Sequence, residues 1–219
     1  MLTRRPTKNS RRGFTLVEVS IVLVLLSIFG GGVAMFMQSS SNSYKSAVTV
    51  LDMESRGRRS LEKIDGLLRK ARPLTMTPIQ SAPWWSSFID FQRDIGSPGA
   101  IVWGNTERLI LEYTPGEVND GIDNDRNGLV DEGQVVWIQN LGLADQTRSV
   151  IARGVCELAV REFANGGDDN GNLLRDEPGF CIDFVGNCMT IRLSLEQVNA
   201  GGVLVSNSYE KSLTLRLVD

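Results

Sequence analysis

The feature that most constrains this chain is a long apolar segment at residues 14–37. Its only polar side chains are those of Thr15, Glu18, Ser20 and Ser27. An α-helix rises about 1.5 Å per residue, so this segment extends for about 36 Å and can cross a hydrocarbon core of about 30 Å. The segment therefore predicts the membrane-spanning half of a helix.

The charges before this segment predict its orientation. Five basic residues and no acidic residue precede it: Arg4, Arg5, Lys8, Arg11 and Arg12. Positive charge beside a span is retained in the cytoplasm. We therefore expect a single-pass protein with a cytoplasmic N-terminus and its body on the opposite side of the membrane.

A secretory signal and a plain single-span anchor are the simpler alternatives. The apolar run is longer than a usual signal core and no small-residue cleavage site closes it, while a lipoprotein signal is excluded because the first cysteine is Cys156. Glu18 argues against both alternatives, since a carboxylate that faces lipid costs on the order of 2.5–3.5 kcal/mol. A span that recognises a partner can satisfy this acid. The other reading is that Glu18 reaches the membrane interface.

The residues around Glu18 form a specific motif. A basic leader ends at Gly13, then Phe14, Thr15 and Leu16 follow, and Glu18 is the fifth residue after Gly13. This pattern resembles the type III signal of type IV pilins and type II secretion pseudopilins, and the resemblance covers residues 1–72.

The resemblance implies how the N-terminus is processed and used. Residues 1–13 are then a leader that prepilin peptidase removes by cleavage between Gly13 and Phe14, after which the Phe14 amine is methylated. Glu18 pairs with the Phe14 amine of a neighbouring subunit, because an amine and a carboxylate attract strongly in a medium of low dielectric constant. The implied partners are prepilin peptidase, other pilin or pseudopilin subunits and the bacterial inner membrane.

The segment after the span continues as an amphipathic helix. Apolar residues from Tyr44 to Ala71 recur at steps of three and four, Arg56–Arg59 interrupts the stripe, and Pro73 stops it. We expect one helix over residues 14–72, with residues 38–72 packed on a globular head. An independent helix on the membrane surface is the alternative. Gly30–Gly32 either weakens the span or allows close helix packing.

Residues 73–219 change to a period of two, which predicts strands. The strand candidates are residues 109–113, 135–138, 156–160, 189–195 and 213–217, and Asn199–Gly202 suits an antiparallel connection between the last two regular strands. A long helix on an antiparallel β-sheet head is an α+β fold.

An acidic segment in the head carries oxygen ligands at the spacing of a calcium loop. The candidate ligands are the side chains of Asp123, Asp125, Asn127, Asp131 and Glu132 and the Leu129 carbonyl, with Gly128 at the sharp turn. Calcium takes six to eight oxygens, so we predict that this loop binds it. The alternative is an ordinary Asx-rich turn.

A second segment repeats these offsets with Asp168, Asn170, Asn172, Asp176 and Glu177. It has one acid among its first three ligands, and Leu173 stands where the first loop has glycine. We therefore expect weaker calcium binding here, or none.

Three cysteines lie in the part expected outside the membrane, where oxidation is permitted. Cys181 and Cys188 are close in sequence, so we predict a disulfide between them and a buried Cys156. Other pairings with Cys156 remain open.

Composition narrows the functional class. The chain has no histidine, which excludes histidine triads and the usual zinc sites, and no nucleophile–base pair is visible. The net charge is −3, and the five basic residues of the leader leave an acidic body, so no nucleic-acid partner is expected.

Because the head is large and carries two insert-like loops, we predict a non-enzymatic minor pilin or pseudopilin. The rivals are a membrane-tethered calcium-dependent enzyme and a DNA-uptake minor pilin.

Overall fold

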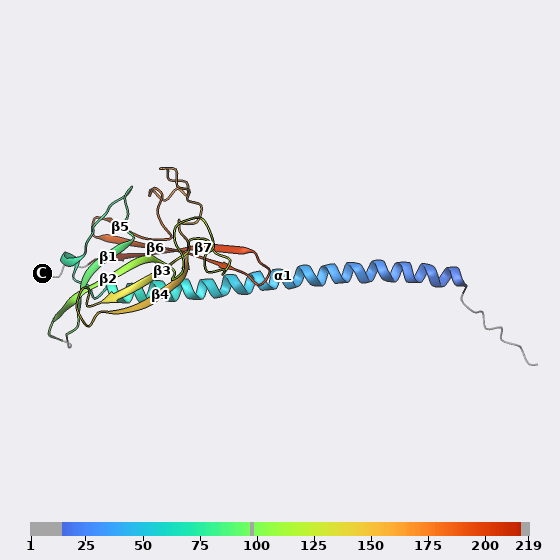
Figure 1. Ribbon diagram of the computed structural model, residues 1–219, viewed down its shortest axis with the longest axis horizontal. Helices are drawn as coiled ribbons and strands as arrows, with labels where there is room; N and C mark the ends of the chain where they lie inside the picture. Colours follow the sequence, from blue (N-terminus) through green and yellow to red (C-terminus); the bar gives the residue numbers. More distant parts are fainter. Residues whose placement is uncertain (1–14, 97–98, 216–219) are drawn as a thin grey trace, which may run out of the picture. The chain divides into compact units, whose positions relative to one another are not determined.

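The computed structural model describes residues 15–96 and 99–215. It divides into two compact units, one ending at Tyr44 and the other beginning at Lys45. One helix, α1 (Leu16–Leu68), supplies residues to both units, and seven antiparallel strands belong to the second unit (Figure 1). The expected α+β class is confirmed.

The first unit is a single stretch of α1 whose side chains are exposed as far as Ser43. It is long and apolar enough to span a membrane. The helix continues without a break through Gly30–Gly32, where an added Cβ would meet no other atom within 4 Å. An apolar helix with no protein partner in its own unit is suited to a lipid environment.

The helix ends at Leu68 and not at Arg72 as expected. Ala71 already forms a bridge with Arg93, and the Arg72 N–H donates to the Gln92 carbonyl at 2.8 Å. Because β-strand residues provide the hydrogen-bond partners of Ala71 and Arg72, these two residues leave the helix, and the helix ends before Pro73. That proline instead begins a short 3-10 helix, η1 (Pro73–Thr75).

The helix α1 passes through Arg56–Arg59 without a break, as expected for one long helix whose apolar stripe alone is interrupted there. Gly57 is buried there against the ring of Tyr209, and a Cβ at this position would clash with that ring. The glycine therefore allows a strand to pack closely on the helix.

The seven strands form one sheet. Their bounds are β1 (Phe88–Asp94), β2 (Trp103–Tyr113), β3 (Gly133–Gln139), β4 (Thr147–Val155), β5 (Phe180–Val185), β6 (Cys188–Val198) and β7 (Leu204–Thr214). The order is β1-β2-β3-β4-β6-β5, and β7 pairs along the whole of β6. Strands β4 and β6 meet only at Val155 and Leu195, so the two parts of the sheet diverge there.

The strand predictions are confirmed for β2, β3 and β6 and for the antiparallel β6–β7 pair. The prediction for residues 156–160 is wrong: β4 ends at Val155, and only Leu158 forms a bridge, with Pro178. The pattern at residues 213–217 begins inside β7, and residues 216–219 lie outside the described part of the chain. Strands β1, β4 and β5 were not predicted. Five consecutive buried residues give β5 no alternation to detect.

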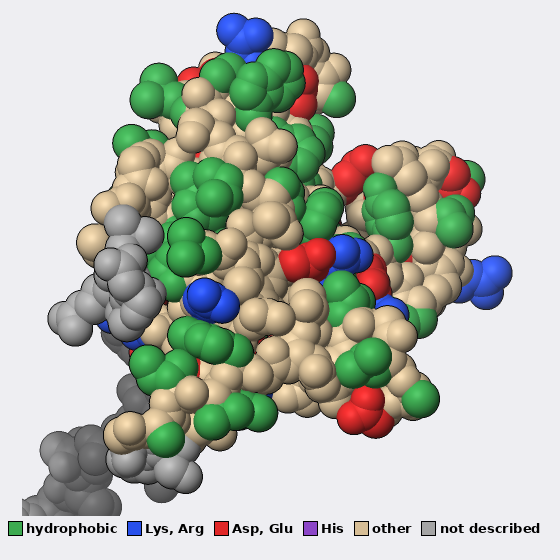
Figure 2. Space-filling model, turned by 90° about the vertical axis from the view of Figure 1, so that its left-hand side faces the viewer, with side chains coloured by type: hydrophobic (Ala, Val, Ile, Leu, Met, Phe, Trp, Pro, Cys, Tyr) green, Lys and Arg blue, Asp and Glu red, His purple; other side chains and the backbone are tan. Residues whose placement is uncertain are grey.

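The core lies between the second part of α1 and the sheet. Met53, Ile64 and Leu68 of the helix share one buried cluster with Phe91 of β1 and Phe180 of β5. Burial of such side chains contributes about 1.5–3 kcal/mol each. On the face shown in Figure 2, Lys and Arg side chains are few and separate from one another.

Candidate functional site

Glu18 lies in the first turn of α1, where it forms a capping box with Thr15. The backbone N–H of Thr15 donates to Glu18 Oε2 at 2.9 Å, and the Glu18 N–H donates to Thr15 Oγ1 at 3.2 Å. This arrangement satisfies N–H groups that every helix N-terminus leaves free. Sequence reasoning missed it, although Thr-x-x-Glu is its signature. Gly13 and Phe14 lie outside the described residues.

The first acidic loop connects β2 to β3 and curls around Asp123. The carboxylate of Asp123 accepts hydrogen bonds from the N–H groups of Asn127, at 3.1 Å, and Gly128, at 2.9 Å. Gly128 has a φ of +90°, a conformation that glycine adopts without strain. The predicted turn at Gly128 therefore has the conformation that a cation-binding curl requires.

The carboxylates that meet in this loop are those of Glu117, Asp123 and Asp125. One oxygen from each lies within 4.8 Å of the others. Glu117 was not predicted, because it lies six residues before Asp123 and outside the calcium-loop spacing. The Asp125 N–H donates to Glu117 Oε1 at 2.7 Å, which holds this buried carboxylate against the loop.

Glu132 is 1% exposed and points into the same loop. Its Oε1 accepts from Asn127 Nδ2 at 2.7 Å, whereas its Oε2 is buried without a hydrogen-bond partner. Glu117 Oε2 is also buried and unpartnered. A buried carboxylate oxygen without a partner is costly, and this loop holds two of them.

Two predicted ligands have other contacts. The Asp131 carboxylate accepts from the N–H groups of Asp120, at 3.2 Å, and Gly121, at 2.8 Å, and so it fixes the start of the loop. Leu129 buries its side chain, and its N–H donates to Asn127 Oδ1 at 2.8 Å, so the role of its carbonyl as a ligand stays a prediction. The structure therefore brings Asp123, Asp125, Asn127 and Glu132 together and places Asp131 as a positioning residue.

The second acidic segment connects β4 to β5. Asp168 accepts from the N–H groups of Asn172, at 3.0 Å, and Leu173, at 2.8 Å. Leu173 has a φ of +75°, so it adopts the glycine conformation despite its side chain. Asn170 and Asn172 both donate to Glu177, while Asp176 accepts from the Gly166 N–H at 2.9 Å.

Acidic side chains also meet beside the first loop. Burial, and then the charge of Glu132, raise the pKa of Glu196 to about 7. The pKa of the neighbouring thiol of Cys156 is also raised by burial. Burial beside other carboxylates therefore favours the protonated, neutral forms of both groups.

The predicted disulfide between Cys181 and Cys188 is absent, and both are free thiols, as is Cys156. Cys181 lies opposite Arg192 in the β5–β6 pair, whereas Cys188 lies opposite Val185 beside the turn. This register separates the two cysteines along the hairpin, so their sulfur atoms cannot meet. The expected burial of Cys156 is confirmed, at 6% exposure.

Comparison with protein families gives one match, to the prokaryotic N-terminal methylation motif over residues 8–34. The chain carries a prepilin-type signal. The match includes Gly13, Phe14 and Glu18 and extends into the apolar helix, which agrees with membrane anchoring and with processing of the pilin type. Comparisons with curated proteins and with solved structures give no match.

Proposed function

We propose that this chain is a minor subunit of a type II secretion or type IV pilus filament, anchored in the bacterial inner membrane by α1. The observation that carries the proposal is the prepilin-type motif at residues 8–34, which runs directly into an exposed apolar helix. The large head with two loops supports a minor subunit. The basic leader supports a cytoplasmic N-terminus and a head on the other side of the membrane.

In this proposal prepilin peptidase cleaves between Gly13 and Phe14. Gly13→Leu should leave an uncleaved precursor, heavier by residues 1–13, in intact-mass measurements of the membrane fraction. Leu2→Ala, a change inside the leader but away from the cleavage site, should be cleaved normally. Complete cleavage of Gly13→Leu would refute the proposed processing.

Glu18 has two proposed roles, closure of its own capping box and charge pairing with the Phe14 amine of a neighbouring subunit. Glu18→Gln separates them, because glutamine retains the capping hydrogen bond but has no charge. We expect Glu18→Gln to be inserted and cleaved but to lose co-purification with partner subunits. Thr15→Val, which removes the hydroxyl half of the cap and keeps the charge of Glu18, should still co-purify. Wild-type co-purification of Glu18→Gln would rule out charge pairing.

We further propose that the first acidic loop binds calcium through Glu117, Asp123 and Asp125, with Glu132 and Asn127 able to complete the shell. All of these donors are oxygens, which hard cations prefer, and calcium accepts an irregular shell more readily than magnesium. The support is the pair of buried, unpartnered oxygens on Glu117 and Glu132. The bound ion would neutralise the clustered carboxylates and hold the loop closed.

The calcium proposal is tested on the full-length chain in detergent by thermal unfolding. Calcium should raise the melting temperature relative to chelator, and magnesium should substitute poorly. Asp125→Ala should remove most of the calcium effect. Identical melting in calcium and chelator would exclude the site while leaving the assignment of the signal untouched.

A further inference from the structure

We infer that the second acidic loop is a second site for the same divalent cation, built as a structural copy of the first around Glu162 and Glu177. The inference rests on the calcium proposal for the first loop. It selects weaker binding over no binding, the two outcomes expected from the sequence for this segment.

The two loops are copies of one 19-residue unit, residues 114–132 and 159–177. A backbone hydrogen bond closes each unit between its first and last residues, from the Thr114 N–H to the Glu132 carbonyl at 3.0 Å and from the Ala159 N–H to the Glu177 carbonyl at 2.9 Å. Positive φ angles occur at five matching positions: Gly116 and Arg161, Gly121 and Gly166, Arg126 and Gly171, Gly128 and Leu173, and Asp131 and Asp176.

The copy includes the glutamate that precedes each loop. Glu162 Oε1 accepts from the Asn170 N–H at 3.0 Å, as Glu117 Oε1 accepts from the Asp125 N–H at 2.7 Å. Glu162 is 6% exposed, and its Oε2 is buried without a partner. The feature that marks the first site is therefore present in the second.

Glu177 supplies the second buried carboxylate and is 0% exposed. Its Oε1 accepts from Asn170 Nδ2 at 2.7 Å and Asn172 Nδ2 at 2.6 Å, so its head lies inside the loop. Its Oε2 is buried with no donor. Two buried, unpartnered carboxylate oxygens carry a desolvation cost that an oxygen-binding cation would offset.

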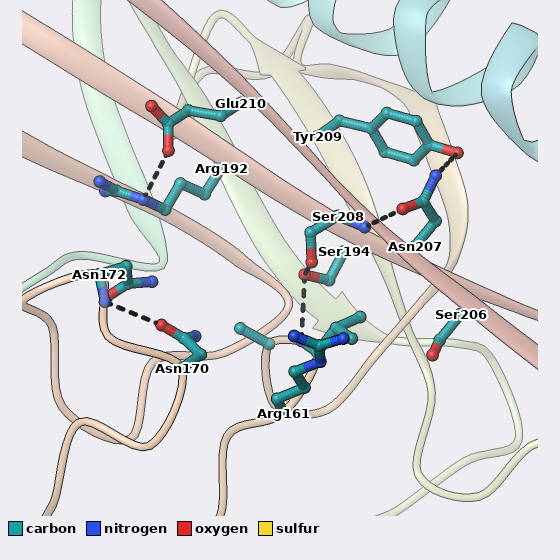
Figure 3. A pocket seen from close by; sticks show the side chains of 12 residues that line it. Arg161, Asn170, Asn172, Arg192, Ser194, Ser206, Asn207, Ser208, Tyr209 and Glu210 are labelled. Carbon is teal, nitrogen blue, oxygen red and sulfur yellow. Dashed lines mark hydrogen bonds and ion pairs between the residues drawn. The ribbon is translucent and has the colours of Figure 1, made fainter.

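Access to this loop is open. Asn170 and Asn172 line a cavity of about 490 Å³ that also contacts Ser194 and Ser208. Figure 3 shows the two asparagines next to each other on a loop at the edge of this cavity, where the Asn172 N–H donates to Asn170 Oδ1. A hydrated cation can therefore reach the loop from solvent.

The two sites differ in charge. Asn170 stands where the first loop has Asp125, so the second site has one carboxylate fewer. Calcium affinity follows the number of charged ligands. We therefore expect calcium to occupy the first loop at lower concentration and the second loop at higher concentration.

Calcium binding to the full-length chain in detergent, measured by equilibrium dialysis against chelator-treated buffer, should give two ions per chain. Glu162→Gln and Glu177→Gln should each bind one ion at the affinity of the first site. Asp169→Asn is the matched control, because Asp169 lies in the same loop and bonds to Asn165 Nδ2, and it should still bind two. Asn170→Asp should tighten the weaker site by on the order of tenfold or more.

Terbium, which takes calcium ligands, gives a second readout. The Trp85 indole N–H donates to the Arg175 carbonyl of the second loop at 2.7 Å, so Trp85 can transfer excitation to an ion there. Trp85 also lines a cavity with Asp131 of the first loop, so an ion in either loop can receive this excitation. Terbium emission excited through tryptophan should therefore fall but persist in part in Glu162→Gln, and it should fall further in Trp85→Phe.

Binding of one ion per chain that Glu162→Gln and Asn170→Asp leave unchanged would overturn the second site and leave the first intact. No binding at all would refute both sites, and the processing test would still decide the proposed subunit function. Asn170→Asp is expected to bind calcium more tightly. It therefore tests the inference even if Glu162→Gln and Glu177→Gln fail to fold.

Discussion

The backbone N–H of Asp125 donates a hydrogen bond of 2.7 Å to Glu117 Oε1. This contact holds a buried carboxylate beside two exposed or half-exposed aspartates whose oxygens lie within 4.8 Å. Like charges this close repel each other, and burial strengthens the repulsion. A positive ligand would relieve this repulsion.

Removal of the Glu117 charge should abolish the calcium response of the first loop. A ligand that binds only the folded state stabilises it by about 2.7 kcal/mol at a hundredfold excess over Kd. In Glu117→Gln most of this stabilisation should disappear from calcium-dependent unfolding of the full-length chain, while stability in chelator stays equal or increases. Asp145→Asn, in the β3–β4 turn, should retain the full response. A full response in Glu117→Gln would exclude this residue as a ligand.

The contact between Gly57 and Tyr209 predicts a reversed glycine effect. Glycine to alanine in a helix normally stabilises by about 1 kcal/mol. At Gly57 a Cβ would overlap the buried ring, and overpacking of this kind costs about 1–3 kcal/mol, so Gly57→Ala should destabilise the head. Gly66→Ala is the matched control on the same helix, because a Cβ there meets nothing within 4 Å, and it should stabilise. Denaturant unfolding measures the free energy of unfolding of both variants. Equal changes in the two would show that the Tyr209 ring moves aside.

The cysteines predict a simple labelling pattern. Cys156 and Cys181 are buried, and burial raises the pKa of both thiols, so neither should react with maleimide at neutral pH in the folded chain. Cys188 is partly exposed and should react. Intact mass should show one label before unfolding and three after unfolding without reductant. A single label after unfolding would reveal a disulfide.

Glu196 predicts a pH dependence for the metal-free chain. Burial raises the pKa of Glu196 to about 7 in the folded state, above its ordinary value near 4.3. The folded state then binds more protons than the unfolded state between these values, so stability in chelator should fall as pH rises through this window. Glu196→Gln should flatten that slope, and Glu62→Gln, on the exposed side of α1, should retain it. A steeper slope in Glu196→Gln would contradict the assignment.

Several features follow from sequence alone because their causes are local. Apolarity and length define the span at residues 14–37, and strict spacing defines the motif around Glu18. Alternation predicts β2 and β6, since each buries one face more than the other, and the apolar run at residues 135–138 predicts β3. The offsets of Asp123, Asp125 and Asn127 predict a curl around a cation because the ligands are neighbours in the chain.

Other features depend on partners that are distant in sequence. The end of α1 was decided by Gln92 and Arg93, which take the backbone of Arg72 and Ala71 into the sheet. The free state of Cys181 was decided by the β5–β6 register, which no local pattern encodes.

The same division applies to the acidic loops. The sequence determined that two segments share ligand offsets, because those ligands follow one another within ten residues. Only the tertiary structure decided that Glu117 and Glu162 accept hydrogen bonds from these loops, that Asp131 and Asp176 fix the loop start, and that Leu173 adopts the turn conformation. The physical reason is burial: a carboxylate becomes costly, and hence a candidate ligand, only when the folded chain removes water from one of its oxygens.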